Sequence, residues 1–166
     1  MNRRHVTMLP AACSSAAPLP DIPIGDGASR KRLFDARRLI EAAMARQAAR
    51  SIDDAHLAKL KDALEANRQA IGDHRLFMQT DIEFHRILFQ ISGNPVFGSV
   101  HAVVVSWLMK CWGEIDRDEV TERLAFQGHA KVSDAVAQGD PDAAERAMNQ
   151  HLSASWSIWA GQFRQH

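Results

Sequence analysis

Apolar and polar residues follow a helical period from Ser29 to the end of the chain. Apolar side chains return every three or four positions, as they do on one face of an α-helix. The pattern predicts six helices, at about residues 30–50, 51–71, 74–92, 95–115, 118–138 and 140–163. A short β-branched run, Val103-Val104-Val105, lies inside one of these helix-length segments. We therefore expect an all-α fold, an antiparallel bundle of about six helices.

Two helix–helix turns have a clear chemical signature. The order glycine, then asparagine or aspartate, then proline occurs at 93–95 and again at 139–141. Glycine suits the left-handed end of a helix, Asn94 or Asp140 suits the cap of the next helix, and proline suits its first position. These segments predict tight connections between the third and fourth helices and between the fifth and sixth.

The first 29 residues differ in composition from the rest. They contain four prolines interspersed with serines and glycines, and they show no helical or strand period. Such a segment buries too little apolar surface to order itself. We expect residues 1–29 to be a poorly ordered tail and residues 30–166 to be one helical domain.

Composition and charge narrow the functional classes. The formal net charge is zero, whereas proteins dedicated to nucleic-acid binding carry a basic excess. The two cysteines, Cys13 and Cys111, are far apart, which is typical of a reducing compartment, so we expect a cytoplasmic protein. No apolar run reaches the ~18 residues that a membrane-spanning helix needs. The N-terminal residues also make a poor secretion signal, because Pro10 and two serines interrupt the apolar stretch.

Four residues with metal-binding side chains fall on apolar helix faces. Asp81 and His85 are four positions apart and share a face with Phe77 and Leu88. Two further histidines lie on inward stripes of the fifth and sixth helices, namely His129 and His151. A buried carboxylate needs a cation, a hydrogen-bond network or a metal. Imidazoles and a carboxylate from three helices suit a divalent transition metal, Zn²⁺ first and Ni²⁺ second.

Other interpretations of these residues stay open. Each inward histidine can be an ordinary core residue with hydrogen-bond partners, and a four-ligand set can close a purely structural Zn²⁺ site. A metalloenzyme would need a general base beside the metal. Glu83 points away from Asp81 on a helix, and Glu41 is interpreted as a surface residue. We therefore expect a binding module rather than an enzyme.

The motifs together resemble the C-terminal effector-binding domain of GntR-family transcription regulators, of the FadR C-terminal domain type. The similarity covers about residues 30–155. It depends on short motifs in family order: an acidic-x-Arg stretch at 35–41, an Asp-x-x-Phe-His signature at 81–88, Ile-Ser-Gly-Asn-Pro at 91–95, Gly-His at 128–129 with Ala-Val-Ala-Gln-Gly-Asp at 135–140, and a final segment at 143–152.

The resemblance implies a helical bundle that encloses a metal and a small-molecule pocket. It assigns the metal to Asp81, His85, His129 and His151. It also implies a small organic-acid effector whose carboxylate binds the metal and a cationic anchor on the first helix, which matches Arg37 here. On the residues alone, Arg37 either points inward or forms a salt bridge at the rim. Asn94 is a further candidate ligand contact, although helix capping explains it as well.

The resemblance also bears on partners. Regulators of this family are usually dimeric, and Trp107 and Trp112 on the fourth helix serve either an interface or the core. Regulators of this family also have a winged-helix DNA-binding domain that precedes the effector-binding domain. Only about 29 residues precede the first expected helix here, so we expect no DNA binding by the family mechanism from this chain as given.

Overall fold

The computed structural model describes residues 26–112 and 118–162. These ranges form six α-helices and contain no strand, which confirms the all-α class. The helices are α1 (Gly27–Ser51), α2 (Asp54–Gln69), α3 (His74–Ile91), α4 (Pro95–Trp112), α5 (Glu119–Ala137) and α6 (Pro141–Gln162).

Each helix begins at a side chain that accepts a hydrogen bond from its first turn. The oxygen of an aspartate or asparagine accepts from a backbone N–H two or three residues later, over 2.7–3.0 Å, at Asp26, Asp53, Asp73, Asn94, Asp118 and Asp140. A cap of this kind stabilises a helix by about 1 kcal/mol. The predicted glycine turns are present too, with φ of 72° at Gly93 and 64° at Gly139. The sequence thus specifies where these helices begin.

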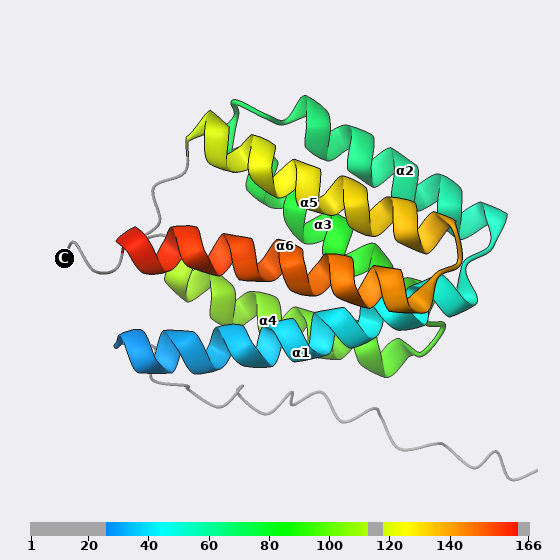
Figure 1. Ribbon diagram of the computed structural model, residues 1–166, viewed down its shortest axis with the longest axis horizontal. Coiled ribbons are helices and arrows are strands. Elements are labelled where there is room, and N and C mark those ends of the chain that lie inside the picture. Colours follow the sequence, from blue (N-terminus) through cyan, green and yellow to red (C-terminus); the bar gives the residue numbers. More distant parts are fainter. Residues whose placement is uncertain (1–25, 113–117, 163–166) are drawn as a thin grey trace, which may run out of the picture.

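The helices pack as a bundle around α3 and α6. In Figure 1, α6 lies between α1 and α5, and it packs along both. α3 contacts α1, α2, α4 and α5, whereas α4 lies at the edge and, among the described helices, contacts α3 and α1 alone. α1, α3, α5 and α6 therefore surround one interior.

The boundaries differ slightly from the predicted ones. α1 begins at Gly27 rather than at 30, because Asp26 provides the cap and Ser29 lies within the first turn. The expected ends of the fourth helix at 115 and of the sixth at 163 fall outside the described residues, as does most of the expected tail at 1–29. No helix in the described ranges is both long enough and apolar enough to cross a membrane.

The bundle interior combines an aromatic and aliphatic core with a polar centre. Phe77, Phe84, Leu88 and Met148 are at most 1% exposed. Ten polar or charged residues are also buried in the described part of the chain: Arg37, Glu41, Asn67, Asp81, His85, His101, Glu122, His129, Ser133 and His151. Buried polar groups are costly unless they are paired, so we expect the candidate site among these residues.

Candidate metal and effector site

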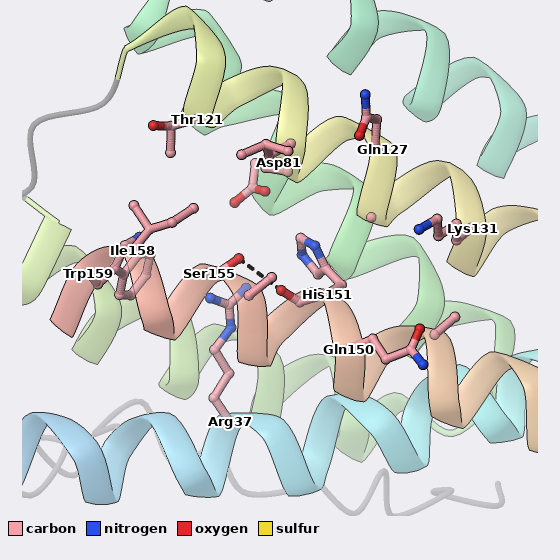
Figure 2. A pocket seen from close by; sticks show the side chains of 15 residues that line it. Arg37, Asp81, Thr121, Gln127, Lys131, Gln150, His151, Ser155, Ile158 and Trp159 are labelled. Atoms are coloured by element: carbon pink, nitrogen blue, oxygen red, sulfur yellow. Dashed lines mark hydrogen bonds between the residues drawn. The ribbon is translucent and has the colours of Figure 1, made fainter. Parts of the chain in front are cut away.

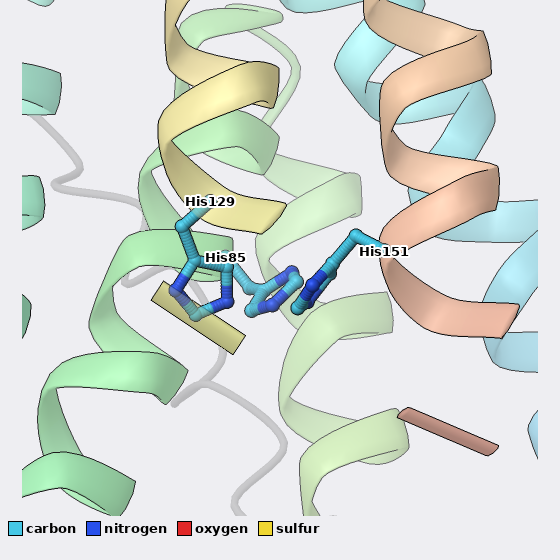
Figure 3. A group of neighbouring side chains, drawn as sticks. All are labelled: His85, His129 and His151. Atoms are coloured by element: carbon cyan, nitrogen blue, oxygen red, sulfur yellow. The ribbon is translucent and has the colours of Figure 1, made fainter. Parts of the chain in front are cut away.

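Three imidazole rings from three helices converge in the interior (Figure 3). His85 comes from α3, His129 from α5 and His151 from α6, and their exposed fractions are 2%, 0% and 6%. One nitrogen from each ring lies within 4.8 Å of the other two. The three histidines that the sequence singled out therefore form one group.

Asp81 joins this group through one carboxylate oxygen. Its Oδ1 lies 3.1 Å from Nε2 of His129 and 4.0 Å from Nε2 of His85. The i, i+4 spacing places Asp81 one turn before His85 on the same face of α3. All four predicted ligands are thus neighbours in the folded chain.

The surroundings of His129 and His151 favour neutral imidazoles. Burial lowers the pKa of His129, although Asp81 acts in the opposite direction. Burial, and then the neighbouring rings of His129 and His85, hold the pKa of His151 well below its ordinary value. Neutral imidazole is the form that binds a metal, because a lone pair is then available.

His129 has the arrangement expected of a metal ligand. Its Nδ1 lies 2.9 Å from Oδ1 of Asn67, and the Asn67 amide is oriented by its own donation to Thr80 Oγ1 over 3.0 Å. Nδ1 is therefore the protonated nitrogen, and Nε2 has the lone pair. Nε2 is fully buried and has no aligned hydrogen-bond partner. A buried lone pair without a partner is costly, and a metal ion would satisfy it.

His85 is held by a carboxylate that sequence analysis misplaced. Glu41 was interpreted as a surface residue, and this is wrong, because it is 2% exposed. Its Oε2 lies 2.6 Å from Nδ1 of His85, and its Oε1 accepts from Nε of Arg37 over 2.7 Å. Burial alone would raise the pKa of the Glu41 carboxyl, but Arg37 and His85 together hold it well below its usual range. The signal in the sequence was its i, i+4 spacing from Arg37, which puts both residues on one face.

His151 packs directly against the backbone of α5. A Cβ placed on Gly128 would lie 2.2 Å from Nδ1 of His151 and 2.8 Å from its Cγ. Only a residue without a side chain leaves room for this ring, so glycine at 128 lets α5 and α6 approach closely. The Gly128-His129 pair therefore supplies both a ligand and the space for another.

A cavity of about 280 Å³ opens beside the cluster, between α5 and α6. Figure 2 shows Arg37 extending from α1 toward it, with Asp81 and His151 along its wall. The remaining lining comes from α5 and α6 and mixes polar with apolar side chains: Thr121, Leu124, Ala125, Gln127, Gly128, Lys131, Ala147, Gln150, Ala154, Ser155, Ile158 and Trp159. Two candidate metal ligands, Asp81 and His151, and the guanidinium of Arg37 thus line the same cavity.

The two predicted effector-binding residues lie in different places. Arg37 is 4% exposed, so it points inward, and its ion pair with Glu41 is also buried. Asn94 does not reach the cluster. It is exposed, its Oδ1 accepts from the N–H of Val96, and it lines a separate hollow with His56 and Lys59.

One further buried histidine was left unassigned by the sequence. His101 on α4 is 4% exposed, and its ring centroid lies 4.9 Å from that of Phe89. Burial lowers its pKa to about 4, with Glu41 acting in the opposite direction. It is not among the histidines whose nitrogens converge.

Comparison with known proteins decides the family. Residues 32–154 match the FCD domain, the C-terminal effector-binding domain of GntR regulators. The chain belongs to the FCD domain family. The match confirms the resemblance carried by the sequence motifs, and it makes this FCD domain a regulatory module rather than an enzyme.

Relatives and solved structures agree with this assignment. The FCD domain is 37% identical over 125 residues to the HTH-type transcriptional repressor NanR of Citrobacter rodentium, and 38% identical to NanR of Salmonella schwarzengrund. Each alignment covers 74% of this chain and 48% of the relative, so the chain spans about half the length of these curated relatives.

Two solved structures share the fold. Streptococcus agalactiae GntR matches with a TM-score of 0.60 and 24% identity, over 75% of this chain and 56% of the other. E. coli McbR/YncC matches with a TM-score of 0.70 and 16% identity, over 89% and 77% of the two chains.

Proposed function

We propose that this FCD domain senses a small carboxylate effector with the help of a divalent metal ion. Asp81, His85, His129 and His151 would hold the metal, and Arg37 would bind the effector carboxylate beside it. The observation that carries the proposal is the buried Nε2 lone pair of His129, which lies 3.1 Å from Asp81 and has no aligned hydrogen-bond partner. The donor set suits Zn²⁺ first and Ni²⁺ second.

The charges around the cavity favour an anion. Asp81 is the single acidic residue among the described lining residues, whereas Arg37 and Lys131 are both cationic there. A guanidinium presents parallel N–H donors that match the two oxygens of a carboxylate. When bound, the metal would supply a Lewis acid for a carboxylate oxygen. Amides and hydroxyls of Gln127, Gln150 and other lining residues suit polar groups on the rest of a small organic acid.

Effector binding would act through the helices that meet at the site. Arg37 on α1, His85 on α3, and the cavity walls on α5 and α6 all belong to one interior. An effector that contacts all of them favours the helix arrangement in which those contacts are best, and so shifts the population toward it. The curated relatives are transcriptional repressors, and we infer that effector sensing by this FCD domain serves the regulation of transcription.

Neither glutamate that was considered as the base of a metalloenzyme is placed for that role. Glu83 pairs with Arg86 over 2.6 Å on the outer side of α3, and both carboxylate oxygens of Glu41 face Arg37 and His85. A purely structural metal site remains the main competitor. The cavity that Asp81 and His151 line favours sensing over that competitor, because a structural site is closed on all sides.

A second copy of the chain is the partner that we propose for α4. Of the other described helices, α4 contacts α3 and α1 alone, and Val96 and Met109 on its surface are 61% and 39% exposed. Trp107 is partly buried, and the side chain of Trp112 lies outside the described residues. Exposed apolar side chains on an edge helix suit a homodimer interface. Light scattering of the wild type and of Met109→Glu tests this, because a dimer at this face would dissociate in the variant.

Elemental analysis of the purified chain tests the sensor directly. We expect near-stoichiometric Zn or Ni in the wild type and none in the His85→Ala/His129→Ala double variant. A thermal-shift screen of small carboxylates, with and without added Zn²⁺, would then identify the effector class. A wild type that takes up no metal at neutral pH even after supplementation would refute the metal-dependent sensor.

A further inference from the structure

Glu41 is buried in the interior but is not one of the candidate metal ligands. Its carboxylate oxygens contact Arg37 and Nδ1 of His85, on the side of that ring away from the cluster, and it does not line the cavity. Its Oε1 accepts a hydrogen bond from Nε of Arg37 over 2.7 Å. Its Oε2 lies 2.6 Å from Nδ1 of His85, an ion-pair contact that is not aligned as a hydrogen bond. Glu41 would therefore act on a bound metal through its two partners, His85 and Arg37.

The contact with Glu41 determines which nitrogen of His85 faces the cluster. A carboxylate beside Nδ1 favours a proton on that atom, and the lone pair then lies on Nε2. Nε2 of His85 is the nitrogen that lies 4.0 Å from Asp81. Asn67 acts in the same way on His129, with Oδ1 2.9 Å from Nδ1. Two candidate ligands are thus oriented by side chains from two other helices, α1 and α2.

Arg37 connects Glu41 to the cavity, because it contacts both. The same guanidinium that lines the cavity donates to Glu41, and its Nη2 lies 3.5 Å from Nε2 of His85. We propose that Glu41 is a positioning residue for the metal ligand His85 and that, through Arg37, it couples that ligand to the effector cavity. This inference rests on the proposed metal-dependent function.

A matched pair of variants tests the positioning role. Glu122 on α5 is also 2% exposed, but its carboxylate accepts from the N–H of Gly72 and lies 3.4 Å from His74, away from the cluster. Zn²⁺ affinity is measured by competition with a chelator at neutral pH. We expect Glu41→Gln to bind Zn²⁺ about 10- to 100-fold more weakly than the wild type, as is usual when a side chain that orients a metal ligand is changed. Glu122→Gln should stay within about twofold of the wild type, since it removes an equally buried charge elsewhere.

The outcomes separate this inference from the proposed function. A wild type that binds Zn²⁺ and a Glu41→Gln variant that binds it equally well would overturn the positioning role alone. Equal losses in Glu41→Gln and Glu122→Gln would also overturn it, because the loss would then reflect general destabilisation. A wild type without Zn²⁺ affinity would overturn the proposed function together with this inference.

Nitrogen-15 chemical shifts of the imidazole rings give a readout that a merely structural role would not move. In the wild-type chain we expect His85 with its proton on Nδ1, and we expect Glu41→Gln to shift this ring while the ring of His129 keeps its shifts. A wild-type His85 with its proton on Nε2 would overturn the proposal.

A double-variant cycle tests the link through Arg37, with Zn²⁺ again as the probe. If Arg37 acts on His85 through Glu41, Arg37→Gln should change the Zn²⁺ affinity of the wild type but add less than about twofold in the Glu41→Gln background. Effects that multiply independently would show that Arg37 does not act through Glu41.

Discussion

Glu41 and Glu122 are equally buried but have different partners. Each is 2% exposed, one on α1 and the other on α5. Glu41 pairs with a guanidinium and an imidazole inside the candidate site, whereas Glu122 accepts from the backbone N–H of Gly72 at the turn between α2 and α3. The comparison shows that burial of a carboxylate does not by itself reveal its role. The partners reveal it: Glu41 contacts a candidate metal ligand, whereas Glu122 holds the backbone of a helix–helix turn.

Removing the Glu41 side chain should have the largest effect on stability. Glu41→Ala breaks a buried ion pair with Arg37, and breaking such a pair from one side costs about 3–5 kcal/mol of unfolding free energy. Urea unfolding followed by circular dichroism measures this. A loss below about 1 kcal/mol would show that water reaches this pair and that the site is more open than its burial indicates.

Removing the Glu122 side chain should lower the free energy of unfolding by a smaller amount. Glu122→Ala leaves the Gly72 N–H without its carboxylate acceptor, and an unsatisfied polar group costs about 1–3 kcal/mol. The same urea titration gives the value. A loss larger than that of Glu41→Ala would reverse the comparison, and it would make the α2–α3 turn the more constrained of the two regions.

Gly128→Ala should disturb the candidate site without changing any charge. The new methyl group would overlap the His151 ring, so the ring must move or the helices must separate, at a cost of about 1–3 kcal/mol. We also expect weaker Zn²⁺ binding, because His151 would be displaced. Gly161→Ala on α6 is the matched control, since nothing lies within 4 Å of its added Cβ. Unchanged Zn²⁺ affinity in Gly128→Ala would remove His151 from the ligand set.

Stability should fall as the pH falls below about 6.5, the ordinary histidine pKa. The folded-state pKa values of His129 and His151 are lowered by burial, and that of His101 is lowered to about 4. Below pH 6.5 the unfolded chain therefore takes up protons that the folded chain does not. Each such histidine contributes a slope of about 1.4 kcal/mol per pH unit, and for His101 the window runs from 6.5 to about 4.

Unfolding titrations at several pH values, repeated with Zn²⁺, measure this dependence. The metal-free chain should lose stability between pH 7 and pH 5, and the metal-loaded chain should lose more over the same range, because acid also releases the metal. Stability of the metal-loaded chain that is unchanged between pH 7 and pH 5 would contradict the prediction. The Glu41→Gln variant should lose its metal at a higher pH than the Glu122→Gln variant, which sharpens the comparison between the two glutamates.

Removing the charge of a surface glutamate should have the smallest effect on stability and on Zn²⁺ affinity. Glu65 on α2 pairs with Arg68 over 2.6 Å, but both side chains are about half exposed. Exposed pairs contribute little because solvent screens them. We expect no measurable change in Tm for Glu65→Gln and no change in Zn²⁺ affinity. A clear loss of either would mean that charge at any position on α2 matters, and the contrast between Glu41 and Glu122 would then lose its meaning.

The sequence by itself determined the helices and the main candidate ligands. Helical periodicity, capping aspartates and turn glycines act over a few residues, so they can be identified without a structure. The same local logic put Asp81 and His85 on one apolar face, because residues four apart on a helix are neighbours. It also singled out His129 and His151 as inward residues.

Only the tertiary structure decided what holds those ligands in place. Asn67 and His129 are 62 positions apart, and Arg37 and His85 are 48 apart, so no local pattern connects them. Whether a charged residue at a helix face is buried depends on which helix packs over it and at what distance. That is why Glu41 looked like a surface residue, and why the sequence left both a capping role and a ligand contact open for Asn94. The packing of α1 against α3 and the close approach of α6 to Gly128 settled the surroundings of the site, because both are properties of the whole bundle.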